Sequence, residues 1–317
     1  MRPPSLLHAL PLGFILAISC TRADPEPAAT KGTPPTAPAI QGEAQPAETT
    51  QASETVNLRG VPVRGATHRE EMTFEATDAL LTMKMAGLAL TGTMSMKSQT
   101  TDDFEIIDVG EGEARKGRLS HVLDKETMSM RFVLPDGSEE AETLEENGVL
   151  HGRVESLESI GGSWKRTLEG APPTPVQARL LSTEPFGEQA YPTAIRVGES
   201  WTTRGPELRR WVGSDALSIS GEVKNTLLTV DLVDGEKVAT IESMGEIEAT
   251  MLDEDNSEVT VNLGIKGTTR RSLDRAIDID SSFEGSMKYS GEMVVEGAPV
   301  SMTITGRFTG KLQGSLR

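Results

Sequence analysis

Strict alternation of apolar and polar residues over long stretches is the feature that most constrains what this chain can fold into. From Ile277 to Val295 every second residue is apolar or small, whereas the residues between them are polar as far as Glu292. Residues i and i+2 share one face of a β-strand, so this pattern predicts a strand with one buried face. The same alternation recurs in 217–233, 238–251, 259–265 and 300–312.

These predicted strands are unusually long. Nineteen residues at about 3.3 Å each would span roughly 60 Å, whereas a common strand has about five or six residues. A flat sheet of that length is unfavourable, so we expect kinks or bulges at four inward-facing glycines, namely Gly285, Gly291, Gly306 and Gly310. The prediction is a mainly β fold: a long, curved antiparallel meander that forms a half-barrel or open barrel with an apolar inner face.

The first half of the folded region has the same character, with shorter predicted strands. They are His68–Ala76, Ala79–Met85, Leu88–Met96, Phe104–Val109, Ala114–Val122, Met128–Leu134, Val149–Val154 and Ser163–Leu168. Asp234-Gly235 is a typical hairpin dipeptide, and we expect the acidic segment 138–146 to be a helical turn or a solvated loop. The proline-rich stretch 171–211 predicts an irregular connector, with a short helix at Pro206–Val212 that has proline in its first turn.

The N-terminus has the pattern of an export signal. After Arg2, an apolar run extends from Leu6 to Ile18, which is too short to span a bilayer and is typical of a secretory signal peptide. The run ends in Leu16-Ala17-Ile18-Ser19-Cys20, where Cys20 is the one cysteine of the chain. These residues resemble the lipobox of bacterial lipoproteins, although Ala17 stands where that motif usually has a larger aliphatic residue.

The lipobox resemblance implies that residues 1–19 are removed and that Cys20 carries acyl chains such as palmitate. Thr21 rather than Asp follows the cysteine, which by the sorting pattern of such lipoproteins favours the outer membrane. The alternative is ordinary signal cleavage after Ser19 or Ala23, which would release a secreted protein with a spare thiol. Lipidation gives this lone cysteine a function, so we expect a lipid-anchored protein of the cell envelope.

The chain changes character between the cysteine and the predicted sheet. Residues 20–56 contain six prolines and no aromatic residue, and Ile40 is the one large aliphatic residue before Val56. Such a stretch cannot bury enough apolar area to offset its ordering entropy. It therefore predicts a tether, followed by a single β-rich domain over 57–317 that can be two-lobed.

Composition and motifs argue against several classes of function. The formal net charge of −17 is unsuited to nucleic acid, which attracts cationic proteins. The sequence has no metalloprotease, nucleophile-elbow or phosphate-loop motif, and one cysteine excludes a Cys-rich metal site. We interpret His68, His121 and His151 as surface histidines, and we expect neither enzymatic activity nor a cofactor or resident metal.

Methionines are the most informative apolar residues. They form three M-x-M pairs, and others fall on the inner face of the clearest strands. Because methionine is flexible and polarizable, it suits a surface that accommodates varied apolar ligands. We expect the following to line the core or a site for a lipid or other amphiphile: Met83, Met85, Met94, Met96, Met287, Met293 and Met302. The alternative is Cu(I), which soft thioethers bind; this alternative requires the M-x-M pairs, including Met128 and Met130, to share one region.

A short segment in the connector points to the envelope as well. Tyr191-Pro192 and Val197-Gly198-Glu199-Ser200-Trp201 resemble a stretch in uncharacterised bacterial lipoproteins that share the layout of signal, tether and β-rich domain. We expect Trp201 to close one end of the core. The sequence thus predicts a non-enzymatic envelope lipoprotein that binds a lipid or amphiphile. The alternative is a structural protein whose outer face binds another envelope component.

Overall fold

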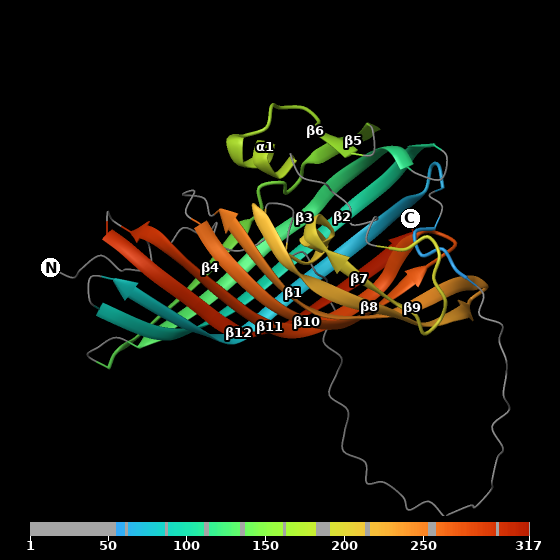
Figure 1. Cartoon of the computed structure of the whole chain (residues 1–317). Coiled ribbons are helices and arrows are strands. Elements are labelled where there is room, and N and C mark those ends of the chain that lie inside the picture. The colour runs from blue at the N-terminus through green and yellow to red at the C-terminus, as the bar shows by residue number, and fades with distance from the viewer. Residues whose placement is uncertain are drawn as a thin grey trace, which may run out of the picture.

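The computed structural model describes residues 55–60, 63–85, 88–110, 114–133, 137–160, 163–181, 191–212, 216–252, 258–295 and 298–316. Its strands form one large antiparallel sheet that curves along its length (Figure 1). They are β1 (Thr67–Met85), β2 (Leu88–Val109), β3 (Ala114–Val133), β4 (Glu139–Asn147), β5 (Val154–Ile160), β6 (Ser163–Leu168), β7 (Ser200–Arg204), β8 (Ser218–Val233), β9 (Glu236–Leu252), β10 (Glu258–Ser272), β11 (Ile277–Val295) and β12 (Ala298–Leu316).

The two halves of the chain meet in the middle of this sheet. The strand order is β6-β5-β3-β2-β1-β12-β11-β10-β9-β8-β7, and β4 pairs with β3 beside β5. β1 and β12 run side by side from the pair His68 and Leu316 to the pair Met85 and Val300 (Figure 1). Among the described residues no ladder joins β6 to β7, so the sheet is open. The predicted half-barrel meander is confirmed.

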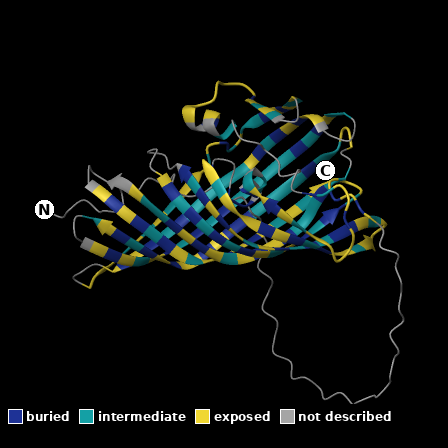
Figure 2. Ribbon diagram, in the orientation of Figure 1, coloured by how far each residue is buried: buried dark blue, intermediate teal, exposed yellow. Residues whose placement is uncertain are grey.

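Burial alternates along the strands as the sequence predicts (Figure 2). In β12, Val300, Met302, Ile304 and Phe308 are at most 6% exposed, and the residues between them are half-buried or exposed. We call the face that carries such buried residues the inner face. Its apolar residues, contributed by strands from both halves of the chain, form the largest core cluster, which we call the main core cluster.

A bulge explains why β1 looked like two strands in the sequence. The ladder with β2 shifts register between Ala76 and Ala79, and Asp78 has a φ of 50°. Phe74 and Ala76 are buried before the shift, and Ala79 and Leu81 after it. The extra residue of a bulge reverses which residues face inward without ending the strand. β1 is therefore one strand of 19 residues.

Other predictions also differ from the structure. Residues 149–152, expected to begin a strand, form turns before β5 begins at Val154, and β7 lies in the connector that was expected to be irregular. β2 and β3 continue through 97–103 and 123–127, where polar residues on both faces hide the alternation. The acidic segment expected as a helical turn or loop is β4, which pairs with β3 from Lys125 to Val133. Glutamate and alanine are poor strand formers, but the ladder and the partly buried Leu144 outweigh that preference.

The inward glycines do more for packing than for bending. Only Gly306 lies at a register shift, opposite the bulge of β1. Gly285, Gly291 and Gly310 lie in regular ladders. A Cβ at Gly310 would lie 2.2 Å from the Phe283 ring, and one at Gly285 would lie 2.8 Å from the Phe308 ring. These two glycines therefore leave room for aromatic rings that lie over the neighbouring strand.

The connector between the halves contains the helical elements. α1 spans Pro175–Leu181, η4 spans Gly205–Leu208, and α2 spans Arg209–Val212, so the predicted short helix is present as a 3₁₀ turn followed by one α turn. Thr174 and Gln177 cap α1 reciprocally, through Thr174 Oγ1 and Gln177 Oε1. Within the described part of the chain, none of these helices is long and apolar enough to cross a membrane.

Candidate functional site

The inner face brings most of the predicted lining methionines together. Met83, Met94, Met96, Met287 and Met302 are 1–6% exposed, and all five belong to the main core cluster. The partly buried Met85 packs against the same cluster. Met293 pairs with Val300 in the β11–β12 ladder, but its side chain lies outside the described residues. The methionines are thus neighbours on one surface, although the chain's own atoms cover them.

Two of the M-x-M pairs lie directly opposite each other. Met94 pairs with Met130, and Met96 pairs with Met128, across the β2–β3 ladder. We call these four residues the methionine block. Directly opposite residues have Cβ atoms about 4.5–5.5 Å apart, and all four side chains are 2–5% exposed. On the other side of β3, Glu142 pairs with Met130, and its Oε2 atom is buried without a hydrogen-bond partner.

The connector contributes the residues that pack onto this face from outside the long strands. Leu208 and Val212 are fully buried and Trp211 is 9% exposed, and all three belong to the main core cluster. The Trp211 ring meets the Phe283 ring edge to face, with centroids 5.5 Å apart. An apolar ligand that reaches the methionines must therefore lie beside these connector residues or displace them.

On the inner face, the hydroxyl of Tyr289 has no hydrogen-bond partner among the described residues. Tyr289, in β11, is 3% exposed and pairs with Val261 on one side and Ile304 on the other, both of which are buried and apolar. Its hydroxyl oxygen is buried and makes no hydrogen bond. Burial raises the pKa of Tyr289 well above its usual value, and the charge of Glu126 raises it further. The hydroxyl is therefore neutral, with an O–H donor that no residue in the described part of the chain satisfies.

A charged cluster lies on β2, β3, β5 and β6, and sequence reasoning missed it. His121 contacts Asp102 through Nδ1 at 2.9 Å and Glu155 through Nε2 at 2.8 Å. Arg166 donates to both Glu155 oxygens at 2.7 Å. Glu155 is fully buried, and His121 is 8% exposed. The interpretation of His121 as a surface residue was wrong, and His68, also 8% exposed, is buried as well.

The electrostatics of this cluster favour a charged histidine. Burial opposes the imidazolium form, but the hydrogen bonds to Asp102 and Glu155 outweigh it and raise the pKa of His121 to about 9. Burial raises the pKa of Asp102, partly offset by its hydrogen bond with His121. Burial also opposes the charge of Glu155, but hydrogen bonds from His121 and Arg166 lower its pKa. Both histidine nitrogens contact carboxylates, so the arrangement holds strands together rather than activating a nucleophile.

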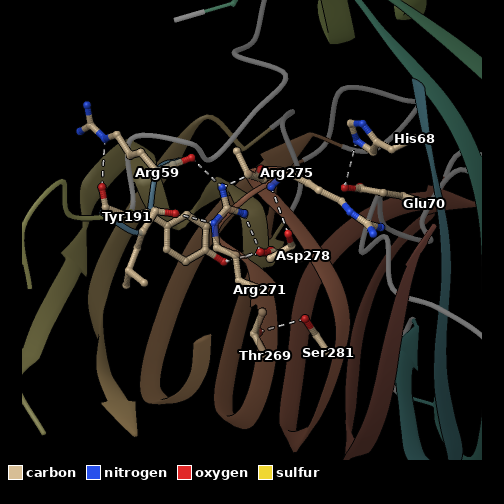
Figure 3. A network of polar contacts seen from close by, with 12 residues as sticks. Arg59, His68, Glu70, Tyr191, Thr269, Arg271, Arg275, Asp278 and Ser281 are labelled. Atoms are coloured by element: carbon tan, nitrogen blue, oxygen red, sulfur yellow. Dashed lines mark hydrogen bonds and ion pairs between the residues drawn. The ribbon is translucent and has the colours of Figure 1, made fainter. Parts of the chain in front are cut away.

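A second charged cluster fastens the start of the domain to the sheet (Figure 3). Arg271, 4% exposed, donates to the carbonyls of Leu58 at 2.6 Å and Arg59 at 3.2 Å. It also donates to Asp278 at 2.7 Å, and its guanidinium lies 4.2 Å from the centre of the Tyr191 ring. The Tyr191 hydroxyl donates to the same carboxylate. We call this group the Arg271 clamp.

The segment that resembles other lipoproteins packs beside this clamp. Val56 and Ile195 form a β-bridge, with N–H···O distances of 2.8 and 3.0 Å. Trp201 is partly buried against the core cluster that contains Tyr191, and the two ring centroids are 6.4 Å apart. Trp201 therefore packs against a cluster that is separate from the main core cluster, and its closing of one end of the core stays a prediction. The first residues after the tether are held against this cluster too.

Other predictions concern residues that the structure does not describe. Cys20, the signal segment and nearly all of the tether lie outside the described ranges, so cleavage and acylation stay predictions. Among the described residues, no group of three or more His, Cys, Asp and Glu side chains is arranged to hold a metal ion. The thioethers of the methionine block are a different class of ligand.

No family model and no curated protein matches the chain. Similar solved structures include a DUF1329 family protein from Desulfovibrio piger ATCC 29098, with 10% identity over 80% of this chain and 85% of that chain and a TM-score of 0.15. Another is the COG4313 outer membrane channel from Pseudomonas putida F1, with 9% identity over 85% and 100% of the two chains and a TM-score of 0.16. Similarity at this level assigns no function.

Proposed function

We propose that this protein is a lipid-anchored envelope protein that binds a lipid or other amphiphile on the inner face of its half-barrel, without catalysis. The observation that carries the proposal is the gathering of most of the predicted lining methionines in one apolar cluster on the inner face of an open sheet. Thioether side chains repack readily around apolar ligands of varied shape. Among the described strands, no ladder joins the edges at β6 and β7 to close the sheet around this face.

The anchor is part of the same proposal. Acyl chains on Cys20 would hold the protein on the membrane that supplies the ligand, and more than one chain is needed for stable anchoring. Labelling cells with radioactive palmitate tests this, using Cys20→Ser as the comparison. The wild-type protein should carry label that Cys20→Ser lacks. Equal labelling of the two would contradict the anchor without touching the binding site.

Photo-crosslinking tests the binding site directly. A photoactivatable acyl phospholipid is supplied to cells that express the full chain, and the crosslinked peptides are identified by mass spectrometry. Residues i and i+2 share a face, so crosslinks should fall on alternate residues of β1, β11 and β12, among them Met83, Met287 and Met302. Crosslinks confined to outward residues such as Thr303 and Lys288 would contradict a ligand on the inner face.

A second candidate function follows from the methionine block. Its four thioethers lie opposite one another in two adjacent strands, which brings two of the three M-x-M pairs into one region, and thioethers are ligands that select Cu(I). The test is Cu(I) titration of the full chain against a chromophoric chelator, with a Met94→Leu/Met130→Leu variant as comparison. Leucine has nearly the same volume as methionine, so the variant removes the thioethers and keeps the packing. If the block is a copper site, the wild type binds Cu(I) and this variant does not.

A further inference from the structure

The unsatisfied hydroxyl of Tyr289 is an anomaly among the apolar residues that pair with it. Buried polar groups normally have hydrogen-bond partners, and leaving one without a partner costs free energy. A phenylalanine would fill the same space without that cost. Tyr289 therefore carries a hydroxyl that weakens the unliganded protein, and such a group is explained if a ligand satisfies it.

The position of Tyr289 shows where that ligand would lie. Its ladder partners Val261 and Ile304 are 0% and 4% exposed, and Met287, two residues away on the same strand and face, is 1% exposed. All of them belong to the main core cluster. A partner for the hydroxyl must therefore be a polar atom carried into an apolar environment by an apolar chain. Amphiphiles whose polar group adjoins an acyl chain have this form.

The charge near Tyr289 restricts which polar atom fits. Glu126 lies on β3, separated from β11 within the sheet by β2, β1 and β12. At about 4.8 Å per strand these two strands are roughly 19 Å apart along the sheet, yet Glu126 acts on Tyr289 electrostatically. Because the sheet is curved, Glu126 and Tyr289 interact across the concave space on its inner side rather than along the sheet. A negative charge on this side disfavours an ionised carboxylate as ligand, whereas a neutral acceptor is not repelled.

The hydrogen-bonding role of the hydroxyl restricts the ligand further. The unsatisfied group is an O–H donor, so it requires an acceptor. An ester carbonyl is an acceptor without a donor of its own. A ligand hydroxyl would bring another donor into the same apolar surroundings, and that donor would need a partner in turn.

We propose that Tyr289 donates a hydrogen bond to the ester carbonyl of an acyl lipid bound on the inner face, so that the site selects ester-linked acyl chains. This inference rests on the proposed function and names its ligand class. The proposed function requires that amphiphiles bind, and the inference requires in addition that the ester carbonyl is recognised.

Two lysophospholipids of equal chain length and headgroup separate these requirements. One is the 1-acyl ester, and the other is the 1-O-alkyl ether, which lacks only the carbonyl oxygen. The full-chain protein is mixed with both in equal amounts, and native mass spectrometry measures the ratio of the two complexes. The wild type should prefer the ester roughly tenfold, as expected for one hydrogen bond to an otherwise unsatisfied buried group.

Tyr289→Phe is the decisive variant, and Tyr191→Phe is its matched control. Tyr289→Phe should bind both lipids without preference and, in the absence of ligand, unfold at a higher denaturant concentration than the wild type. Tyr191→Phe removes the chain's other tyrosine hydroxyl, which donates to Asp278 in the Arg271 clamp. It should unfold at a lower denaturant concentration and keep the preference for the ester.

The outcomes distinguish the two proposals. Binding of neither lipid by the wild type would overturn the proposed function. Equal binding of both by the wild type, or an ester preference that persists in Tyr289→Phe, would overturn the role of Tyr289 and leave amphiphile binding intact. Loss of the preference in Tyr289→Phe alone, with higher stability of the unliganded variant, supports the inference.

Discussion

Two buried charged clusters connect segments that are far apart in the sequence. The cluster of His121, Asp102, Glu155 and Arg166 links β2, β3, β5 and β6. The Arg271 clamp links residues 58 and 59 to β10 and β11. Ion pairs of this kind are costly to desolvate, and removing one partner leaves an uncompensated charge. At the scale of single residues, these clusters therefore make the sharpest predictions about stability.

The stability of the protein should depend on pH through His121. The pKa of His121 is raised from 6.5 to about 9 in the folded protein, so its contribution is fully present below pH 6.5 and is lost as the pH rises through about 9. The free energy of unfolding should fall by roughly 2–3 kcal/mol across this window on account of His121. Chemical denaturation at several pH values measures it.

Variants assign this pH dependence to one residue. His121→Gln should flatten the decline, because no imidazolium remains between Asp102 and Glu155. Lys125→Gln removes an exposed ion pair on the same strand and should leave the decline unchanged. A decline of equal size in His121→Gln would show that other groups cause it.

Two adjacent arginines provide a matched test of the clamp. Arg271 and Asp278 have side chains 5% and 13% exposed, whereas Arg270 and Asp280 have side chains 41% and 43% exposed. Arg271→Met should lower the free energy of unfolding by about 3–5 kcal/mol, and Arg270→Met by less than about 1 kcal/mol. Denaturant titrations measure both losses, and the comparison is valid when the wild type and the variants have equal m-values. Similar losses in the two variants would contradict the structural role of the clamp.

At the scale of strands, the sequence predicted the β-structure where one face is apolar and failed where it is not. The second half of the sheet has long alternating stretches, as in β11, and was predicted closely, except that β10 continues to Ser272 beyond the predicted 259–265. β1 was divided in two because the bulge at Asp78 reverses the alternation. β2 and β3 were interrupted because Asp102 and Glu126 lie on the inner face, and a polar inner face removes the signal on which the prediction depends.

Sequence reasoning found one part of the site and missed another. The methionines were found because i and i+2 spacing places them on one face, whichever strand they belong to. The partners of His121 come from three strands, so only the strand pairing of the folded sheet brings them together. Tyr289 was placed on the inner face by its spacing, but nothing in the sequence indicates that its hydroxyl lacks a partner.

The glycines of β12 and β10 test how closely the strands are packed. A Cβ at Gly310 would overlap the Phe283 ring, whereas one at Gly264 would meet only the hydroxyl of Ser286, at 2.8 Å. Gly310→Ala should destabilise the protein by about 1–3 kcal/mol through overpacking. Gly264→Ala should be close to neutral, because the serine side chain can rotate away. Thermal unfolding compares the two, and equal midpoints would contradict the packing described for Phe283.

At the scale of the whole molecule, the order of the strands places the start and end of the domain in the centre of the sheet. β1 and β12 are neighbours, and the connector between the halves joins the two outer strands. The connector also supplies Leu208, Trp211 and Val212 to the inner face. Sequence alone predicted the curved meander but not this arrangement, because strand pairing between the ends of a chain leaves no local pattern.

The most direct test of amphiphile binding is the mass of the full-chain protein purified from its own membranes. Mass is measured once under native conditions and once after denaturation. Acyl chains attached to Cys20 are covalent and contribute to both values, whereas a ligand on the inner face contributes only to the native one. We predict a native mass greater by one lipid, which denaturation removes. Identical native and denatured masses would contradict the proposed function.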